Sequence, residues 1–232
     1  MRRAFPLSLL VVAVAVAAAG CGGSSGDSAT TAAESTVATS GAGETTASGE
    51  CTDVAAPAPR KDGGATAPKE RLDPEQTDTL VFKTNCGSFT VTLDTAGAPA
   101  TAASLVSLAK AGFYNDTIFH RIVPGFVIQG GDPTQTGRGG PGYQTVDAPP
   151  SDARYVKGVV AMAKKGTEPA GTSGSQFFVV TGADAGLPPD YAIVGNVTQG
   201  IDVVEQIGEF GDPATEKPTR PVVIESVTVG VQ

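Results

Sequence analysis

Eight short β-rich runs, separated by segments that contain glycine or proline, recur through the sequence after residue 78. They span residues 79–84, 88–94, 118–122, 126–129, 159–162, 176–180, 192–198 and 222–229. In the second run Phe89, Val91 and Leu93 alternate with polar residues, which is the period of a strand with one buried face. A turn at residues 85–87 precedes this run. Many short strands of this kind predict a β-barrel or a β-sandwich.

Two segments interrupt the β pattern and are predicted to be helical. The first runs from about Pro99 to Ala111, with a proline in its first turn and Gly112 past its end. The second runs from about Asp202 to Gly208 and begins with an acidic residue, which suits a helix N-terminus. The expected domain, residues 71–232, is therefore mainly β with two helices.

The N-terminal segment predicts export. Arg2 and Arg3 precede an apolar stretch from Leu7 to Ala19, which is too short for a spanning helix and ends in small residues. Residues 1–20 are therefore expected to be a signal peptide. The ending Ala-Ala-Gly-Cys resembles a bacterial lipobox and would make Cys21 the lipidated first residue; plain secretion with an unmodified cysteine is the alternative. The protein is expected to lie on the extracytoplasmic face of the cell membrane, held there by a lipid anchor.

Charge and composition narrow the possible partners. Loss of residues 1–20 removes two arginines and no acidic residue, so the formal net charge changes from −8 to −10. This charge argues against nucleic acid and against electrostatic binding to anionic lipid. Residues 21–70 are rich in Ser, Thr, Ala, Gly and Pro, and such a segment buries too little apolar surface to order itself. We expect a disordered tether there, with a partly ordered cover on the domain as the alternative.

Two further cysteines remain once Cys21 is assigned to the lipid. Cys51 and Cys86 form an even pair, and in an oxidising compartment such a pair predicts a disulfide. Two free thiols are the alternative, because the sequence does not give the distance between the two Cα atoms. Neither the cysteine spacing nor the single histidine predicts a metal site, and no cofactor is expected.

The segment from Phe119 to Asp132 reads FHRIVPGFVIQGGD and is the strongest functional signal in the chain. It places Arg121 and Gln129 among apolar side chains, between glycine-containing turns. A guanidinium and an amide in an apolar wall can bind backbone carbonyl groups. A hairpin whose arginine merely points to solvent is the alternative.

Three other motifs occur in a fixed order around this segment: GFY at residues 112–114, MA at 162–163 and GSQFF at 174–178. Together with FHRIVPGFVIQGGD they resemble the cyclophilin family of peptidyl-prolyl cis-trans isomerases, over roughly residues 78–230. The resemblance implies a closed eight-stranded antiparallel β-barrel capped by two α-helices. It also implies an isomerase that acts on X-Pro bonds without a cofactor.

The resemblance assigns roles residue by residue. Arg121 would be catalytic and would donate toward the prolyl nitrogen and carbonyl, while Gln129 would anchor the substrate backbone. The proline cup would be formed by Phe126, Met162, Phe178 and Leu187, with Val127 at its edge. The neighbouring groove would be lined by Gly137, Ala163 and Gln176. Tyr191 stands where the best-known eukaryotic members carry histidine.

This sequence departs from the family pattern in two places. The chain has no tryptophan, and Gly186 stands at the position where many members have one. The loop from Lys164 to Ser175 is longer than in short members and begins with two lysines instead of Asn-Ala. The resemblance therefore assigns the residues of the cup but not the specificity of the groove.

Isomerisation of an X-Pro bond needs the amide to lose its resonance, against a barrier of about 18–20 kcal/mol. No proton leaves the substrate, so His120 is expected to be structural and to face the core. The expected partners are proline-containing segments of exported proteins, bound by a monomer. A proline-peptide binding module or holdase with little turnover is the alternative. A structural or adhesion lipoprotein would leave the segment from Phe119 to Asp132 unexplained.

Overall fold

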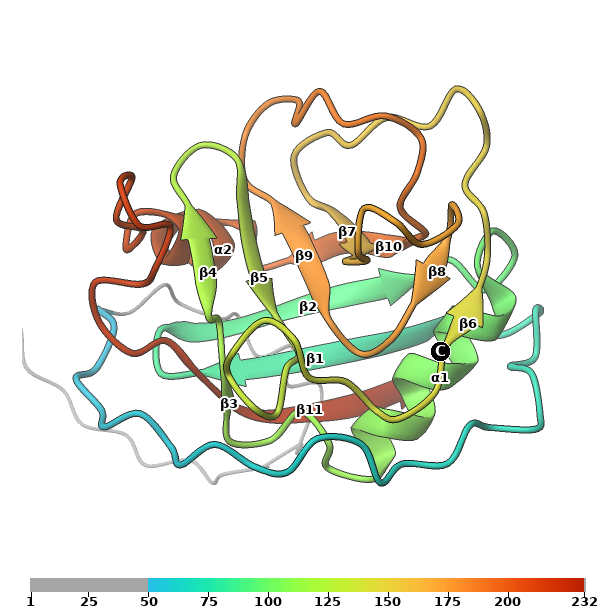
Figure 1. The fold of residues 1–232 in the computed structure, drawn as a ribbon, viewed down its shortest axis with the longest axis horizontal. Helices are drawn as coiled ribbons and strands as arrows, with labels where there is room; N and C mark the ends of the chain where they lie inside the picture. Colours follow the sequence, from blue (N-terminus) through green and yellow to red (C-terminus); the bar gives the residue numbers. More distant parts are fainter. Residues whose placement is uncertain (1–49, 232) are drawn as a thin grey trace, which may run out of the picture. The chain divides into compact units, whose positions relative to one another are not determined.

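The computed structural model describes residues 50–231, which fold mainly into β-strands with two helices (Figure 1). The helices are α1 (Pro99–Lys110) and α2 (Ile201–Gly208). The strands are β1 (Asp78–Thr84), β2 (Gly87–Leu93), β3 (Thr117–Ile118), β4 (Arg121–Val123), β5 (Val127–Gly130), β6 (Thr145–Val146), β7 (Val159–Met162), β8 (Thr172–Ser173), β9 (Phe177–Val180), β10 (Ile193–Gln199) and β11 (Val223–Val231). In this described part of the chain, no helix is long and apolar enough to cross a membrane. The predicted signal peptide and Cys21 lie outside the described residues.

Nine of these strands form one antiparallel sheet in the order β3-β11-β1-β2-β10-β7-β9-β5-β4, and β6 pairs with β8. The mainly β class is confirmed, but the closed eight-stranded barrel is not what the pairings between residues 50 and 231 describe. They give a curled half-barrel whose end strands, β3 and β4, are joined through Phe119 and His120. Eleven strands occur in this range because residues 118–122 divide into β3 and β4, and β6 and β8 were not predicted.

The main core lies on the inner face of the curled sheet. Phe89, Val91 and Leu93 of β2 are buried there, as their alternation with polar residues predicts. The ring of Phe89 stacks on that of Phe82 from β1, with 4.8 Å between centroids. Burial of one large apolar side chain contributes about 1.5–3 kcal/mol, so this layer is a main source of the stability of the domain.

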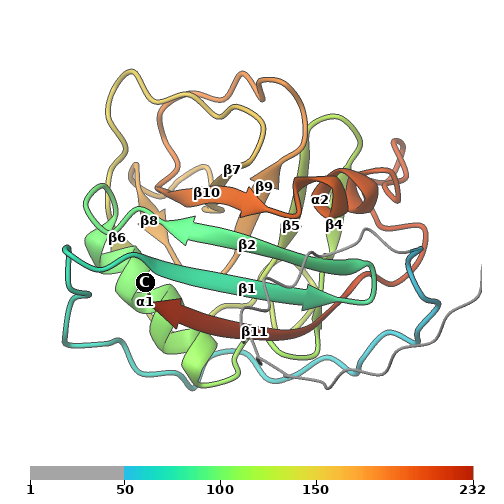
Figure 2. The ribbon, with the colours of Figure 1, turned by 180° about the vertical axis from the view of Figure 1, so that it is seen from behind.

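The two helices pack on different strands (Figure 2). Helix α1 begins at the predicted proline, lies against β11 and β6, and ends one residue before the predicted position. Helix α2 lies against β2, β4 and β5 and buries Val203, Val204 and Ile207. Gly200 precedes it at φ 73°, where a Cβ atom would lie 2.4 Å from the carbonyl oxygen of Ser88. The contact of α2 with the β4–β5 hairpin supports the strands that carry the segment from Phe119 to Asp132.

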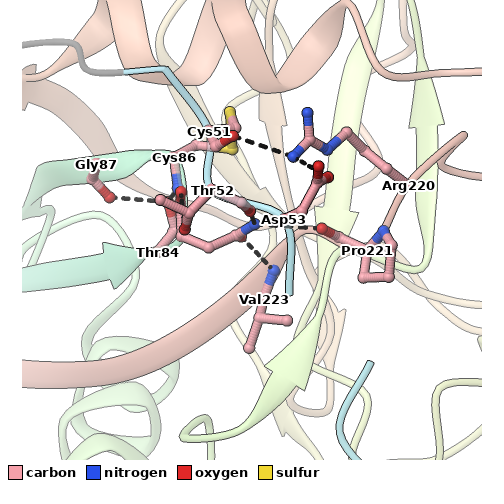
Figure 3. The surroundings of a disulfide bond; sticks show 10 residues. Cys51, Thr52, Asp53, Thr84, Cys86, Gly87, Arg220, Pro221 and Val223 are labelled. Atoms are coloured by element: carbon pink, nitrogen blue, oxygen red, sulfur yellow. Dashed lines mark hydrogen bonds and ion pairs between the residues drawn. A yellow bond between two sulfur atoms is a disulfide. The ribbon is translucent and has the colours of Figure 1, made fainter. Parts of the chain in front are cut away.

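Residues 51–65, which we call the strap, lie along the domain without regular secondary structure. Cys51 is bonded to Cys86 through a disulfide, as predicted (Figure 3). Further along the strap, the Gly63 amide donates to the Gly140 carbonyl at 2.9 Å. The Ala65 amide donates to the carbonyl oxygen of Pro141 at 3.0 Å. For this part of the predicted tether, an ordered cover replaces the flexible chain, because the disulfide and these backbone bonds fix it.

Asn85 joins the beginning of the strap to the sheet. Its side-chain amide donates to the Thr52 carbonyl at 2.7 Å, and its side-chain oxygen accepts from the Val223 amide at 2.8 Å. Arg220 donates to the Cys51 carbonyl at 3.0 Å and pairs with Asp53. The disulfide is therefore one part of a polar network between the strap, the β1–β2 turn and the start of β11.

Candidate active site

A row of paired residues crosses four neighbouring strands, β4, β5, β9 and β7 (Figure 1). Arg121 is opposite Gln129, Gln129 is opposite Phe178, and Phe178 is opposite Ala161. Directly opposite residues share one face of a sheet, so these four side chains lie on the outer face. Their neighbours on the same strands point to the main core: Ile122, Ile128, Val179 and Val160. The sheet therefore brings the predicted catalytic arginine beside the predicted cup.

The turn between β4 and β5 is fixed at its backbone. Gly125 has a φ of 69°, and the Phe126 amide donates to the Val123 carbonyl at 3.0 Å. The Phe126 carbonyl accepts from the Thr181 amide at 2.9 Å. A Cβ atom on Gly182 would lie 2.1 Å from the Gly125 carbonyl oxygen, so this close approach requires glycine. The backbone of Phe126 is thus held in place at the edge of the cup.

The cup is a cavity of about 320 Å³ that is lined mainly by apolar and aromatic side chains. Its lining contains Arg121, Phe126, Val127, Gln129, Ala163, Lys164, Phe178, Leu187 and Tyr191. The rings of Phe178 and Tyr191 meet edge to face, with 5.6 Å between centroids. The hydroxyl of Tyr155 donates to the Tyr191 carbonyl at 2.7 Å and accepts from its amide at 3.0 Å, which fixes this wall. Of the residues predicted for the cup, all but one line it.

Met162 is the exception. It is fully buried and belongs to the main core, and it does not line the cup. Side chains alternate along a strand, so Met162 points away from the face that carries Ala161. Ala163, which was predicted for the groove, lines both the cup and the groove.

The groove is a second cavity, of about 480 Å³, next to the cup. Gln129, Ala163 and Lys164 line both cavities, which places the two side by side. The predicted groove residues Gly137 and Gln176 lie in its wall. Charged residues also line it: Asp62, Arg138, Lys164, Lys165 and Glu168. The groove therefore combines backbone and amide groups with charges of both signs.

Arg121 is held at the rim of the cup by three contacts. Its Nε donates to Oε2 of Glu216 at 2.7 Å, and its Nη1 donates to Oε1 of Gln129 at 3.4 Å. Its guanidinium carbon lies 6.0 Å from the centroid of the Phe126 ring. Among the described residues, Nη2 has no hydrogen-bond partner. This geometry fixes the side chain and leaves a donor for a bound group.

The amide of Gln129 continues this polar row into the groove. Its Nε2 donates to Oε1 of Gln176 at 3.1 Å, and the Nε2 of Gln176 donates to the Gly139 carbonyl at 2.8 Å. These bonds orient both amides relative to Arg121. The predicted anchor and the predicted groove residue are therefore part of one chain of hydrogen bonds.

The buried carboxylate of Asp132 organises the loop that carries Gly137. It accepts the backbone amides of Thr134, Thr136, Gly137, Arg138 and Gly139 at 2.6–3.2 Å. Burial alone would raise the pKa of this carboxyl. The hydrogen bonds from Thr134 and the loop amides outweigh burial and hold the pKa below its ordinary value. At neutral pH the loop is therefore closed around a negative charge.

His120 lies beneath the same loop. Its ring is 3.6 Å from the position that a Cβ atom on Gly137 would occupy, and neither ring nitrogen has a hydrogen-bond partner among residues 50–231. Burial lowers its pKa, so the imidazole is neutral at pH 7. The ring does not line the cup. This placement agrees with a structural role.

Lys164 and Glu216 are site residues that the sequence did not identify. The Nζ of Lys164 pairs with Asp190 at 2.6 Å and donates to the Glu168 carbonyl at 2.9 Å, and its side chain is 1% exposed. The two lysines at the start of the loop, where other members have Asn-Ala, were the sequence signal that could have identified Lys164. Glu216 is 95 positions from Arg121, and no sequence motif connects the two.

The arrangement can bind one small ring in the cup while a guanidinium and an amide donate to the neighbouring peptide group. A pyrrolidine ring fits these requirements, since it is apolar and lies next to an amide that lacks an N–H. Fold and site together thus define a protein that acts on proline-containing peptides.

Comparison with known proteins gives the family. The sequence model described as cyclophilin type peptidyl-prolyl cis-trans isomerase/CLD matches residues 79–229. The probable peptidyl-prolyl cis-trans isomerase A of Mycobacterium bovis is 38% identical over 174 residues, which cover 67% of this chain and 94% of that protein. The peptidyl-prolyl cis-trans isomerase-like 1 of Aspergillus oryzae is 38% identical over 149 residues, with coverage of 62% and 91%.

Solved structures agree with this result. A cyclophilin-type isomerase of Cryptosporidium parvum matches with a TM-score of 0.61 and 30% identity, covering 66% of this chain and 98% of that one. A second structure of the same protein, determined in the presence of the dipeptide Ala-Pro, matches with a TM-score of 0.60 and 29% identity. This chain belongs to the cyclophilin-type peptidyl-prolyl cis-trans isomerases. The resemblance and the enzyme class expected from its motifs are confirmed.

Proposed function

We propose that this isomerase acts on X-Pro bonds of exported or cell-envelope proteins, with Arg121 as the catalytic residue. The observation that carries the mechanism is the position of Arg121: it is fixed at the rim of an apolar cup and keeps Nη2 for the substrate. The cup takes the proline ring, and Gln129 anchors the substrate backbone.

The barrier falls because the site binds the twisted amide better than the planar one. When the X-Pro bond rotates, the nitrogen regains its lone pair and becomes a better hydrogen-bond acceptor. A donor placed there stabilises the transition state more than the ground state, and this difference accelerates the reaction. Phe126, Phe178 and Leu187 exclude water from the ring and strengthen this interaction. No proton is transferred, which leaves His120 without a catalytic task.

Substrate residues before the proline would lie in the groove. Gly137, Ala163 and Gln176 contribute to its wall, and the related Cryptosporidium parvum protein was crystallised in the presence of Ala-Pro. Backbone contacts there suit unfolded segments of many sequences. The chain would act on them as a monomer.

The experiment that separates an isomerase from a proline-peptide binding module follows cis–trans exchange of a short Ala-Pro peptide by NMR. Uncatalysed exchange takes about tens to hundreds of seconds. A small amount of the mature chain should accelerate it strongly, with the peptide in large excess. Binding of the peptide without faster exchange would favour the binding module or holdase.

The location follows from Cys21, the proposed site of lipidation. Two or more acyl chains on this residue would hold the mature protein at the membrane, since each buried CH₂ contributes about 0.8 kcal/mol. Replacing Cys21 with serine should move the protein from the membrane fraction to the soluble fraction. Intact mass should show acyl groups on the wild type and none on the variant. A Cys21→Ser protein that stays at the membrane would contradict the anchor.

A further inference from the structure

The catalytic guanidinium has an anionic partner from a distant part of the chain. Glu216 lies in the loop between α2 and β11, and its Oε2 accepts from Nε of Arg121 at 2.7 Å. The pair is accessible to solvent, with 33% of the Arg121 side chain and 48% of the Glu216 side chain exposed. We propose that Glu216 is a positioning residue that holds Arg121 by Nε and thereby keeps its Nη donors available to the substrate. This inference rests on the proposed role of Arg121.

The backbone around Glu216 is attached to the strand that carries Arg121. The Ile122 amide, one residue after Arg121, donates to the Glu216 carbonyl at 2.9 Å. On the other side, the Glu216 amide donates to the Asp212 carbonyl at 2.7 Å. A Cβ atom on Gly211 would lie 2.4 Å from the Ile122 carbonyl oxygen, so glycine permits this close approach. The carboxylate is therefore placed relative to Arg121 by fixed backbone on both sides.

Glu216 has a backbone conformation that favours glycine. Its φ is 57°, in the left-handed region that residues with a Cβ atom rarely adopt. Such conformations persist where the surrounding structure imposes them, and they are frequent at functional sites. A glycine would relieve the strain but would leave Nε of Arg121 without its carboxylate.

The remaining contacts of Arg121 are weaker. The hydrogen bond from Nη1 to Gln129 is 3.4 Å long, and the contact with the Phe126 ring is a cation–π interaction without a hydrogen bond. An ionised partner gives a shorter and stronger hydrogen bond than a neutral amide. Without Glu216 the long arginine side chain would sample more rotamers, and fewer of them would place a donor at the substrate amide. The consequence is a slower chemical step with little change in substrate binding.

An exposed ion pair contributes little to folding stability, so a role in catalysis can be separated from a role in the fold. The other charged residues of its loop are Glu209, Asp212, Lys217 and Arg220. The hydrogen bond from Arg121 and its positive charge lower the pKa of Glu216. The carboxylate is therefore ionised at neutral pH.

The test measures kcat and KM on an X-Pro peptide for the full mature chain and for Glu216→Ala, Glu216→Gln, Arg121→Ala and the double variant. Glu216→Ala should lower kcat about tenfold and leave KM within about twofold, since the lost contact acts on the transition state. Glu216→Gln retains an acceptor for Nε and should recover most of the rate. In the Arg121→Ala background, Glu216→Ala should have no further effect.

Glu205→Ala is the matched control. Glu205 forms an ion pair with Lys157, and its side chain is 44% exposed, close to the value for Glu216. It lines neither cavity. This variant should keep the wild-type kcat, and all single glutamate variants should unfold at the wild-type temperature.

The outcomes separate this inference from the function on which it rests. If Arg121→Ala is impaired while Glu216→Ala keeps the full kcat, the positioning role is wrong and the mechanism stands. If Glu216→Ala slows the Arg121→Ala protein further, Glu216 does not act through Arg121, and the inference is again wrong. If Arg121→Ala keeps the wild-type rate, both the mechanism and the positioning role fail.

Discussion

Replacing Arg121 with alanine is expected to lower the isomerase rate about 10²- to 10³-fold, the range found when one preorganised donor is removed from an active site. The physical reason is that the cup would still bind the proline ring, while the twisted amide would lose its charged donor. Peptide binding should therefore change much less than turnover. Rates from NMR exchange and affinities from calorimetry measure the two effects separately.

Two further variants show whether the loss is specific. Arg154→Ala removes the same side chain from another exposed ion pair, with Asp184, and should keep the wild-type rate. Arg121→Lys keeps the positive charge but loses the planar fork, so it should restore little activity. A fully active Arg121→Ala protein would mean that the cup accelerates exchange by desolvation alone.

Removing the disulfide between Cys51 and Cys86 is expected to lower the free energy of unfolding by about 4 kcal/mol. The bond joins residues that are 35 positions apart, and in the chain-entropy model its loss increases the freedom of the unfolded chain. Cys51→Ala is the cleaner variant, because Cys86 is 1% exposed and a change there would also disturb the core. Urea unfolding of the two proteins measures the difference.

A reducing agent supplies the control for this experiment. It should destabilise the wild type to the level of Cys51→Ala and leave the variant unchanged. Hydrogen exchange at the Gly63 and Ala65 amides should become faster in the reduced wild type and in Cys51→Ala, because the disulfide no longer holds the strap against the domain. A wild type whose unfolding is insensitive to reduction would show that the strap is held without the disulfide.

Much of the fold could be predicted because its elements have strong local signals. The alternation of Phe89, Val91 and Leu93 gave β2, and a proline and a glycine marked the ends of α1. Every predicted β-rich run has a counterpart in the structure. The division of residues 118–122 into β3 and β4 was not predicted, because strand pairing depends on partners far away in the sequence.

The error at Met162 has a simple cause. Residues 159–162 read VVAM, an entirely apolar run that is buried on both faces of the sheet. Without polar residues there is no alternation to show which side chains face the cup. The position was assigned from its motif, and the pairing of Ala161 with Phe178 shows that the next residue faces the core.

The strap illustrates a different limit. Its composition predicts disorder, because it offers few apolar groups to bury. The structure orders it through the predicted disulfide and through backbone hydrogen bonds to residues 140 and 141, and these backbone bonds cannot be read from composition. The Asp62 carboxylate then reaches the groove and accepts the Gly140 amide at 2.7 Å. A residue of the predicted tether thus lines the groove.

Arg121, Gln129 and Phe178 lie side by side only when β4, β5 and β9 pair in the correct register, so isomerase activity depends on that register. If β5 moved by one residue against β4 and β9, Gln129 would turn inward and Ile128 would turn outward. A chain with this slip would stay compact and rich in β-structure, yet its cup would be dismantled. Isomerase rate therefore reports correct pairing of the strands, which circular dichroism or a size measurement on the same sample would miss.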